Sequence, residues 1–370
     1  MKTAQDVIQI DLDYISGNLQ EEFSCIAGKR LLIIGGAGFL GYYLVQSILH
    51  WNTKVSADKI IELTVYDNYI RGIPDWLTAL ESNPNLTLQK HDITHPLPDN
   101  MGDFQYIIHA ASIASPIFYR KYPIETMDAN VNGLRTLLEY CRTQRDKGTP
   151  VEGFLFYSTS EIYGDPTPEN IPTPETYRGN VSCTGPRACY DESKRYGETL
   201  CVNFAEQYDL PIKIARPFNN YGPGLKITDR RVLPDFARDI LAEKDIIMLS
   251  DGSPTRTFCY IADAIVGYYK ILTNGQPGES YNIGIEKPEI SMANLAERVV
   301  EVAKEIFDYQ GKVVKKVSED EDYLVDNPNR RCPIIEKART QIGYNPSISV
   351  EDGLRRALVW YKDNSQAEDA

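Results

Sequence analysis

The chain has 370 residues, of which 42% are hydrophobic and 25% charged, and these are ordinary values for a soluble globular protein. A chain of this length can bury a core that needs neither disulfides nor a metal. The net charge of −13 argues against nucleic acid or an anionic membrane as the main partner, but it leaves room for a small anionic ligand.

The numbers and spacing of cysteine and histidine indicate the compartment of the protein and whether it binds a metal. The seven cysteines include no CxxC pair, which favours free buried thiols in a reducing compartment. The four histidines have no metal-ligand spacing, so we expect no metal site. No segment has the apolar length needed to span a bilayer, and the opening stretch MKTAQDVIQIDLDYISG lacks a signal-peptide pattern. We therefore expect a cytoplasmic protein.

The first half of the chain alternates apolar strands with helices. Residues 1–28 are expected to form a partly helical N-terminal extension. A strand, a glycine-rich turn and a helix follow in KRLLIIGGAGFLGYYLVQSIL, and further strands are expected in IIELTVYDN, LTLQKHDIT, QYIIHAAS, GFLFYSTSE and PIKIARPFNNYG. Helices are expected over about 124–145 and from near Tyr190. This alternation predicts an α/β fold with a Rossmann-type, doubly wound parallel sheet.

After Gly222 the elements become shorter, in RRVLPDFARDILAE, DIIMLS, SMANLAERVVEVAKEIF and VEDGLRRALVWYK. We predict that residues 29–222 form the Rossmann domain, which also carries the catalytic residues. Residues 223–370 are predicted to form mainly a smaller substrate-binding lobe, from which some segments return to the sheet.

Three glycines, Gly35, Gly38 and Gly41, end the first strand and open the first helix. Glycine permits a tight turn and close backbone approach to a pyrophosphate, which the free N–H groups of the helix N-terminus attract. Asp67 ends the second strand, where a carboxylate can accept hydrogen bonds from an adenosine ribose and would repel a 2′-phosphate. The pattern predicts NAD rather than NADP. Asp92, after the third strand, either meets the adenine edge or is a solvated loop acid.

The GxxGxxG spacing resembles the short-chain dehydrogenase/reductase superfamily, in its extended branch that modifies sugar nucleotides. That resemblance implies a tyrosine and a lysine four residues apart on one helix, and CYDESKRYGE supplies Tyr190 and Lys194. Because the two share a helix face, the ammonium is expected to lower the Tyr190 pKa toward neutrality. The phenolate would then take a proton from a sugar hydroxyl while hydride leaves for nicotinamide. Thr159, after the fifth strand, would supply a hydroxyl to the same oxygen.

Ser160 and Glu161 directly follow Thr159 and are not needed for oxidation at C4 alone. A carboxylate at this place indicates chemistry at C5 or C6 of a 4-keto sugar. Epimerisation, dehydration across C5 and C6, and decarboxylation of a C6 carboxylate all fit. Decarboxylation fits because a C4 ketone makes that carboxylate a β-keto acid.

A closer resemblance extends over residues 30–360. STSEIYGDP, GPRACYDESKRYGETL, ARPFNNYGP, GSPTRTFCYIADAI and DNPNRRCP resemble segments of UDP-glucuronate decarboxylases (UDP-xylose synthases), and HAASIASP looks like that family's loop after the fourth strand. The resemblance implies a UDP-linked sugar substrate and catalytic or substrate-contacting roles for Thr159, Ser160, Glu161, Tyr190, Lys194 and Arg256. Arg256 suits a bidentate pair with a carboxylate or phosphate.

We therefore predict an NAD-dependent decarboxylase that makes UDP-xylose or its 4-keto precursor. A nucleotide-sugar 4,6-dehydratase or 4-epimerase is the alternative, because the Thr-Ser-Glu order also occurs in GDP-mannose 4,6-dehydratases. A non-enzymatic NAD sensor is disfavoured because Tyr190 and Lys194 are both present. The resemblance also implies a homodimer through a four-helix interface that uses the helix of Tyr190.

Four further residues are candidates for contact with the substrate, and most of them also have a purely structural interpretation. Asn219 resembles a contact to the substrate diphosphate. Arg231 and Arg331, or their neighbours Arg230 and Arg330, either neutralise that diphosphate or are surface charges. Tyr260 either lines the uracil or sugar pocket or packs in the lobe.

The cofactor side has further candidates. Asn130 either supports the cofactor loop or caps a helix, and Cys189 is expected to be a small buried thiol. Two segments depart from the family's common pattern: Tyr42 and Tyr43 stand where Ser-His is usual, and DNYIRG stands where DNFFTG is usual. The predicted cofactor set is Gly35, Gly38, Phe39, Leu40, Gly41, Asp67, Asn68, Asp92, Ile93, Ala110, Ala111, Ser112, Asn130, Tyr190 and Lys194.

Overall fold

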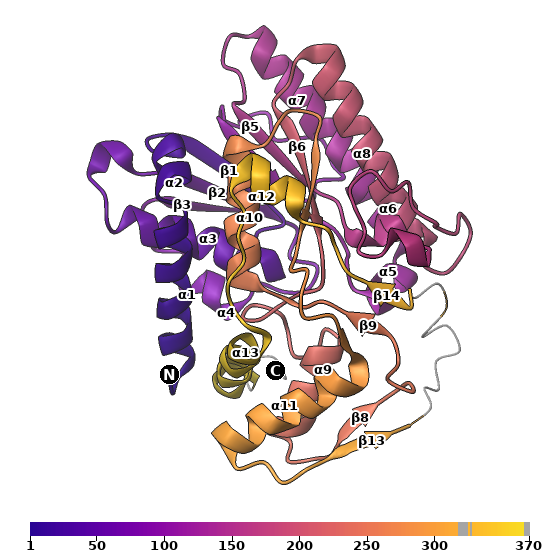
Figure 1. The fold of residues 1–370 in the computed structure, drawn as a ribbon. Coiled ribbons are helices and arrows are strands. Elements are labelled where there is room, and N and C mark those ends of the chain that lie inside the picture. The colour runs from indigo at the N-terminus through magenta and orange to yellow at the C-terminus, as the bar shows by residue number, and fades with distance from the viewer. Residues whose placement is uncertain (317–324, 326–327, 366–370) are drawn as a thin grey trace.

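The computed structural model describes residues 1–316, 325 and 328–365. Within these residues a seven-stranded parallel sheet has the order β11-β6-β5-β4-β1-β2-β3 (Figure 1). Its strands are β1 (Arg30–Ile34), β2 (Glu62–Asp67), β3 (Leu86–Lys90), β4 (Tyr106–His109), β5 (Gly153–Tyr157), β6 (Ile212–Pro217) and β11 (Ser280–Ile283). The predicted doubly wound parallel sheet is confirmed. The edge strand β11 comes from the C-terminal half of the chain and was not one of the strands that we predicted from the sequence.

Helices cover both faces of the sheet (Figure 1). On one face Leu31 and Ile33 of β1 pack in the same core as α3 (Phe39–Asn52) and α10 (Ile261–Asn274). On the other, Leu32 and Ile34 join the core of α7 (Leu134–Asp146) and α8 (Ala188–Tyr208). Successive strand side chains point to opposite faces, and both faces are covered, so the strand is apolar throughout.

The N-terminal extension is a pair of helices built into the core. α1 (Ala4–Asn18) begins with a capping box between Thr3 and Asp6, and α2 (Gln20–Ile26) follows it. α1 runs beside the sheet domain and contacts α3, α10 and α13 (Val350–Asn364) (Figure 1). Five apolar side chains of the extension have no exposed surface: Val7, Ile15, Leu19, Phe23 and Ile26.

The C-terminal lobe lies beyond the carboxyl end of the sheet (Figure 1). It contains α9 (Val232–Leu241), α11 (Met292–Phe307) and α13, with β8 (Ile246–Met248) paired to β13 (Val313–Lys315). Between lobe and sheet, β9 (Thr255–Arg256) pairs with β12 (Ile290–Ser291) and β14 (Arg330–Arg331), and β7 (Asn220–Tyr221) pairs with β10 (Cys259–Tyr260). The remaining helices are α4 (Asp75–Thr78), α5 (Pro116–Lys121), α6 (Pro123–Asp128) and α12 (Glu336–Ile342).

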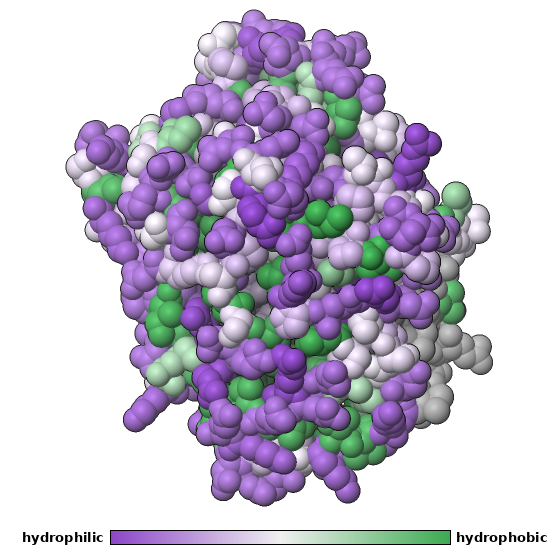
Figure 2. All heavy atoms as spheres, viewed as in Figure 1, coloured by the Kyte–Doolittle hydropathy of each residue, from purple (hydrophilic) through white to green (hydrophobic). Residues whose placement is uncertain are grey.

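The face shown in Figure 2 is mainly hydrophilic, with small and separate hydrophobic patches. Among the described residues, none of the helices combines the length and apolar character that a membrane crossing requires. In the same described part of the chain, no cluster of metal-ligating side chains occurs.

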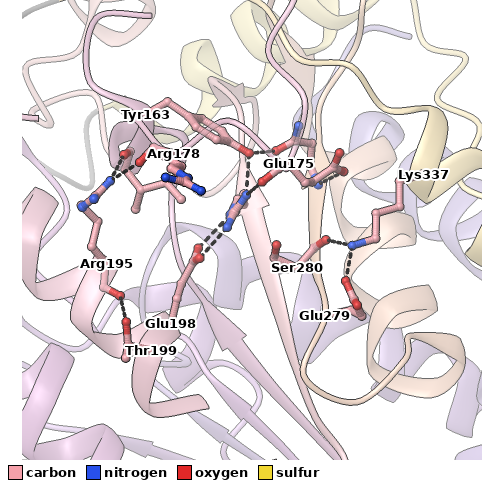
Figure 3. Close-up of polar contacts among 12 residues, drawn as sticks. Tyr163, Glu175, Arg178, Arg195, Glu198, Thr199, Glu279, Ser280 and Lys337 are labelled. Atoms are coloured by element: carbon pink, nitrogen blue, oxygen red, sulfur yellow. Dashed lines mark hydrogen bonds and ion pairs between the residues drawn. The ribbon is translucent and has the colours of Figure 1, made fainter. Parts of the chain in front are cut away.

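A buried ion pair fixes α8 against β6. Arg216 of β6 donates to both carboxylate oxygens of Glu198 on α8, at 2.8 and 2.6 Å, and to the hydroxyl of Tyr163 at 2.7 Å. Figure 3 shows this network around Tyr163, Glu175 and Glu198. Because removing one partner would leave a buried charge unpaired, the network holds the helix in one position. Tyr190 and Lys194 lie on that helix.

Candidate active site

A cavity of about 1170 Å³ lies between the carboxyl ends of the strands and the lobe. This is where open α/β sheets bind their ligands. Most of the predicted site residues line it: Gly35, Gly38, Phe39, Leu40, Asp67, Asn68, Asp92, Ile93, Ala110, Ala111, Ser112, Thr159, Ser160, Glu161, Tyr190, Lys194, Asn219, Arg231, Arg256 and Arg331. Gly41, Asn130 and Tyr260 are not among its lining residues.

In the glycine turn, the neighbouring backbone leaves no space for a side chain at Gly35 or Gly41. Gly35 has a φ of +83°, and a Cβ there would lie 2.5 Å from the Cα of Ala111. A Cβ on Gly41 would lie 2.0 Å from the carbonyl oxygen of Gly36, so this glycine packs the helix onto the turn. Gly38 is the N-cap of α3 and offers no side chain to its first N–H groups, which can receive an anion.

Asp67 closes the other side of this cradle. Its carboxylate accepts hydrogen bonds from the backbone N–H groups of Ala37 at 3.0 Å and Tyr69 at 2.8 Å. Burial raises the Asp67 pKa, although both N–H groups stabilise the charged carboxylate. Additional hydrogen-bond donors, such as ribose hydroxyls, would stabilise the charged carboxylate further. Asp92 is held by Asn68 at 3.0 Å and by Thr94. The Ser112 hydroxyl is buried and has no protein partner. The cradle and this orphaned hydroxyl fit a dinucleotide.

Thr159 and Tyr190 meet where β5 ends and α8 begins. Thr159 follows β5 as the N-cap of a 3-10 turn (Ser160–Tyr163), and its hydroxyl accepts from the N–H of Glu161 at 3.2 Å. Tyr190 lies in the first turn of α8 and its ring stacks on that of Tyr119, with centroids 5.2 Å apart and planes 8° apart. The Nζ atom of Lys194 is 5.8 Å from the centre of the Tyr190 ring. The predicted juxtaposition of Thr159, Tyr190 and Lys194 is present.

The phenol of Tyr190 does not have the lowered pKa that we expected. Burial raises the Tyr190 pKa to about 12, although a hydrogen bond with Thr159 opposes the rise. Burial lowers the Lys194 pKa to about 7, and its Nζ donates to the carbonyl of Tyr157 at 2.7 Å rather than to the phenol. Because desolvation disfavours both charged forms, it outweighs the lysine's influence. The prediction of a lowered Tyr190 pKa is therefore wrong.

Glu161 lies in a group of guanidinium ions. Arg187, the N-cap residue of α8, contacts one of its oxygens, and Arg331 of β14 binds both, with Nη2 at 2.5 Å. Burial would raise the Glu161 pKa, but these two arginines prevail and hold it at about 2. Glu161 is therefore ionised near neutral pH and can accept a proton but not donate one.

Arg256 lies beside this pair because β9 and β14 place Arg256 and Arg331 in register. Arg256 donates to the carbonyls of Thr255 at 2.7 Å and Pro328 at 2.5 Å. Burial and the neighbouring Arg331 lower its pKa to about 9, so it stays charged at neutral pH.

Other predicted residues have different places. The hydroxyl of Tyr260 donates to Asp11 at 2.6 Å, so Tyr260 packs in the lobe rather than facing a ligand. Asn130 lies in a π-helical turn (Ala129–Gly133) and donates to Ser193 of α8 at 2.9 Å; it caps no helix. Asn219 donates to the Thr257 carbonyl at 3.0 Å. Cys189 is half-buried and contacts the carbonyl of Tyr119.

Arg187 and Tyr119 are two of the cavity-lining residues that sequence reasoning missed. Arg187 precedes Tyr190 by three positions and Lys194 by seven, which is a helical spacing that puts all three on one face. Tyr119 belongs to the segment that follows β4, and its aromatic side chain carried no spacing signal.

The sheet order, the glycine cradle and the Thr159–Tyr190–Lys194 arrangement define a Rossmann-fold enzyme of the short-chain dehydrogenase/reductase type. Residues 31–284 match the NAD dependent epimerase/dehydratase family, and the chain belongs to that family. NAD is accordingly its cofactor class.

Two curated relatives match most of the chain. UDP-glucuronic acid decarboxylase 6 of Arabidopsis thaliana is 37% identical over 328 residues, which are 89% of this chain and 87% of the relative. UDP-glucuronic acid decarboxylase 1 of Xenopus tropicalis is 32% identical over 90% of this chain and 72% of the relative.

Solved structures confirm the fold. An epimerase from Methanothermobacter thermautotrophicus superposes with a TM-score of 0.77 at 25% identity, covering 96% of this chain and 98% of that one. A dTDP-glucose 4,6-dehydratase from Streptomyces venezuelae with NAD bound has a TM-score of 0.75 at 25% identity, covering 90% of this chain and 97% of that one.

Proposed function

We propose that the protein is an NAD-dependent UDP-glucuronate decarboxylase, which oxidises C4 of the sugar and releases the C6 carboxylate as CO2. The observation that carries this proposal is the charge of the site. Arg187, Arg256 and Arg331 face Glu161, which is ionised, and Asp191, whose pKa burial and the Glu161 charge raise to about 7. Arg187 and Arg331 thus present guanidinium groups beside Tyr190, and such groups suit bidentate contact with a substrate carboxylate.

A neutral nucleotide hexose, the substrate of a dehydratase or epimerase, has no carboxylate for these guanidinium groups to bind. The relatives named UDP-glucuronic acid decarboxylase support the same choice.

The residues would divide the work as follows. Gly35, Gly38 and Asp67 would hold NAD, which when bound accepts hydride from C4. Tyr190 would take the C4 hydroxyl proton, with Thr159 holding the same oxygen and Lys194 beside the phenol. Glu161 and Ser160 would face C5, and Arg231 and Arg331 would meet the substrate's anionic groups.

The test is direct. Purified protein supplied with NAD and UDP-glucuronate should release CO2 and form a UDP-linked pentose. Turnover of UDP-glucose or another neutral nucleotide sugar, with no CO2 from UDP-glucuronate, would overturn the assignment. Mass spectrometry of nucleotides that co-purify with the protein checks the nucleobase independently.

We also propose a homodimer. Ile124 and Met127 of α6 and Tyr196 of α8 are apolar side chains that are 63%, 43% and 52% exposed, and α6 and α8 are in contact. A second copy would cover this face. Light scattering should give twice the chain mass for the wild type and less for Ile124→Glu; a monomeric wild type contradicts the proposal. The seven free cysteines support a reducing compartment such as the cytoplasm.

A further inference from the structure

Arg71 connects the cofactor side of the cavity to its substrate side. It belongs to the loop that leaves β2 beside Asp67, and the segment 70–76 lines the cavity. Its Nη1 lies 2.9 Å from Oδ2 of Asp229, and its guanidinium lies over the ring of Phe118 at 4.8 Å. Lys226 adds a second link, since its Nζ donates to the Arg71 carbonyl at 3.0 Å. Arg71 lies in DNYIRG, one of the two segments that depart from the common family pattern.

Asp229 is shared between two arginines. Arg231 forms an ion pair with its other oxygen, Oδ1, at 2.8 Å. The Asp229 side chain is only 3% exposed, and its backbone carbonyl accepts from the hydroxyl of Ser115 at 3.0 Å. The carboxylate is thus held in place and buried, and separating it from its cations would be unfavourable.

We propose that Arg71 is a positioning residue that holds the loop 68–74 closed over the adenosine end of NAD, and that Asp229 couples this closure to the substrate diphosphate. This inference rests on the proposed function, which puts NAD at Asp67 and a diphosphate at Arg231. The loop cannot swing away from the cradle unless Arg71 leaves a buried carboxylate.

The coupling has a defined sign. A bound diphosphate would attract Arg231 away from Asp229. Asp229 would then pair with Arg71 only, without a competing cation. The Arg71–Asp229 pair then becomes stronger, so a bound nucleotide sugar should retain the cofactor. Because linkage is reciprocal, a closed loop should also favour nucleotide-sugar binding.

The test measures the release of bound NADH by stopped-flow fluorescence. Arg71→Gln should release NADH roughly threefold to thirtyfold faster than the wild type, the range expected for losing a partly buried ion pair. Arg71→Lys should recover part of the retention. The matched control is Arg355→Gln, which removes an exposed ion pair with Glu305 and should leave release unchanged. Unchanged release in Arg71→Gln, with thermal stability also unchanged, overturns the role of Arg71.

A second arm uses UDP as the probe. UDP should slow NADH release from the wild type and have little effect on Arg71→Gln. If calorimetry shows that UDP binds and slows both proteins equally, the coupling through Asp229 is wrong. If UDP does not bind at all, the proposed substrate class fails together with the coupling, while the ligand-free comparison still decides the role of Arg71.

Discussion

Asp11 of α1 accepts a hydrogen bond from the hydroxyl of Tyr43 on α3 at 2.6 Å, inside the core. The same carboxylate accepts from Tyr260 of the lobe at 2.6 Å and from Arg356 of α13 at 2.7 Å. One residue of the N-terminal extension therefore joins α3, β10 and α13. The extension thus supplies the acceptor for the buried hydroxyl of Tyr43, which stands where the family's common pattern has no tyrosine.

Asp11→Asn should therefore destabilise the protein by about 3 kcal/mol, since it leaves Arg356 and two buried phenols with a poorer acceptor. Asp13→Asn, on the same helix, is the control. Asp13 is 52% exposed and pairs with Lys54 and His50, so its loss should cost less than about 1 kcal/mol. Urea unfolding measures both; equal effects would contradict the central role of Asp11.

Tyr190→Phe should reduce turnover by about 10²–10⁴-fold, because it removes the group that takes the sugar proton. NAD affinity should be retained, since the cradle at Gly35 and Asp67 is untouched. Tyr196→Phe makes the same change on the same helix at a residue that does not line the cavity, and it should leave the rate unchanged. Near-normal turnover by the Tyr190 variant would refute the assigned base.

Lys194 should make the free energy of unfolding depend on pH. Its pKa is about 7 in the folded state against an ordinary value of 10.5, so between these values the unfolded chain binds a proton that the folded chain does not. This group thus makes stability rise with pH, by about 1.4 kcal/mol per unit from roughly pH 7 to 10. Lys194→Met should remove that slope. Stability measured at pH 7, 8 and 9 for both proteins checks it, and parallel curves would show that the burial effect is absent.

Arg187→Gln should raise the KM for UDP-glucuronate about tenfold, because it removes one of the cations that would compensate the sugar carboxylate. Affinity for UDP, which has no carboxylate, should change little. Steady-state kinetics and calorimetry separate the two effects. Equal weakening of both ligands would place Arg187 outside the sugar subsite.

Local patterns were enough to predict the sheet and the cradle. The apolar run before Gly35 predicts a strand that ends in a turn. Asp67, the acid that ends β2, indicates which end of the sheet binds the ligand. The long helix expected over about 124–145 is interrupted by a π-helical turn at Ala129–Gly133, which the apolar pattern does not reveal.

Features that depend on distant residues could not be predicted. Tyr260 faces Asp11, which lies 249 positions away in sequence, so no local signal could direct it away from the ligand. The Tyr190 pKa depends on burial by the completed fold, whereas helical spacing indicates only that Lys194 is near. Arg331 meets Glu161 only because β14 pairs with β9.

The position of β11 has a consequence for biosynthesis. This strand, at residues 280–283, pairs with β6 and completes the sheet only after the chain has traversed much of the lobe. A nascent chain that ends near residue 222 would expose the backbone groups of β6 as an open edge, which invites association with other chains. The Rossmann half should therefore need the later segment in order to stay monomeric and soluble while the ribosome is still extending the polypeptide.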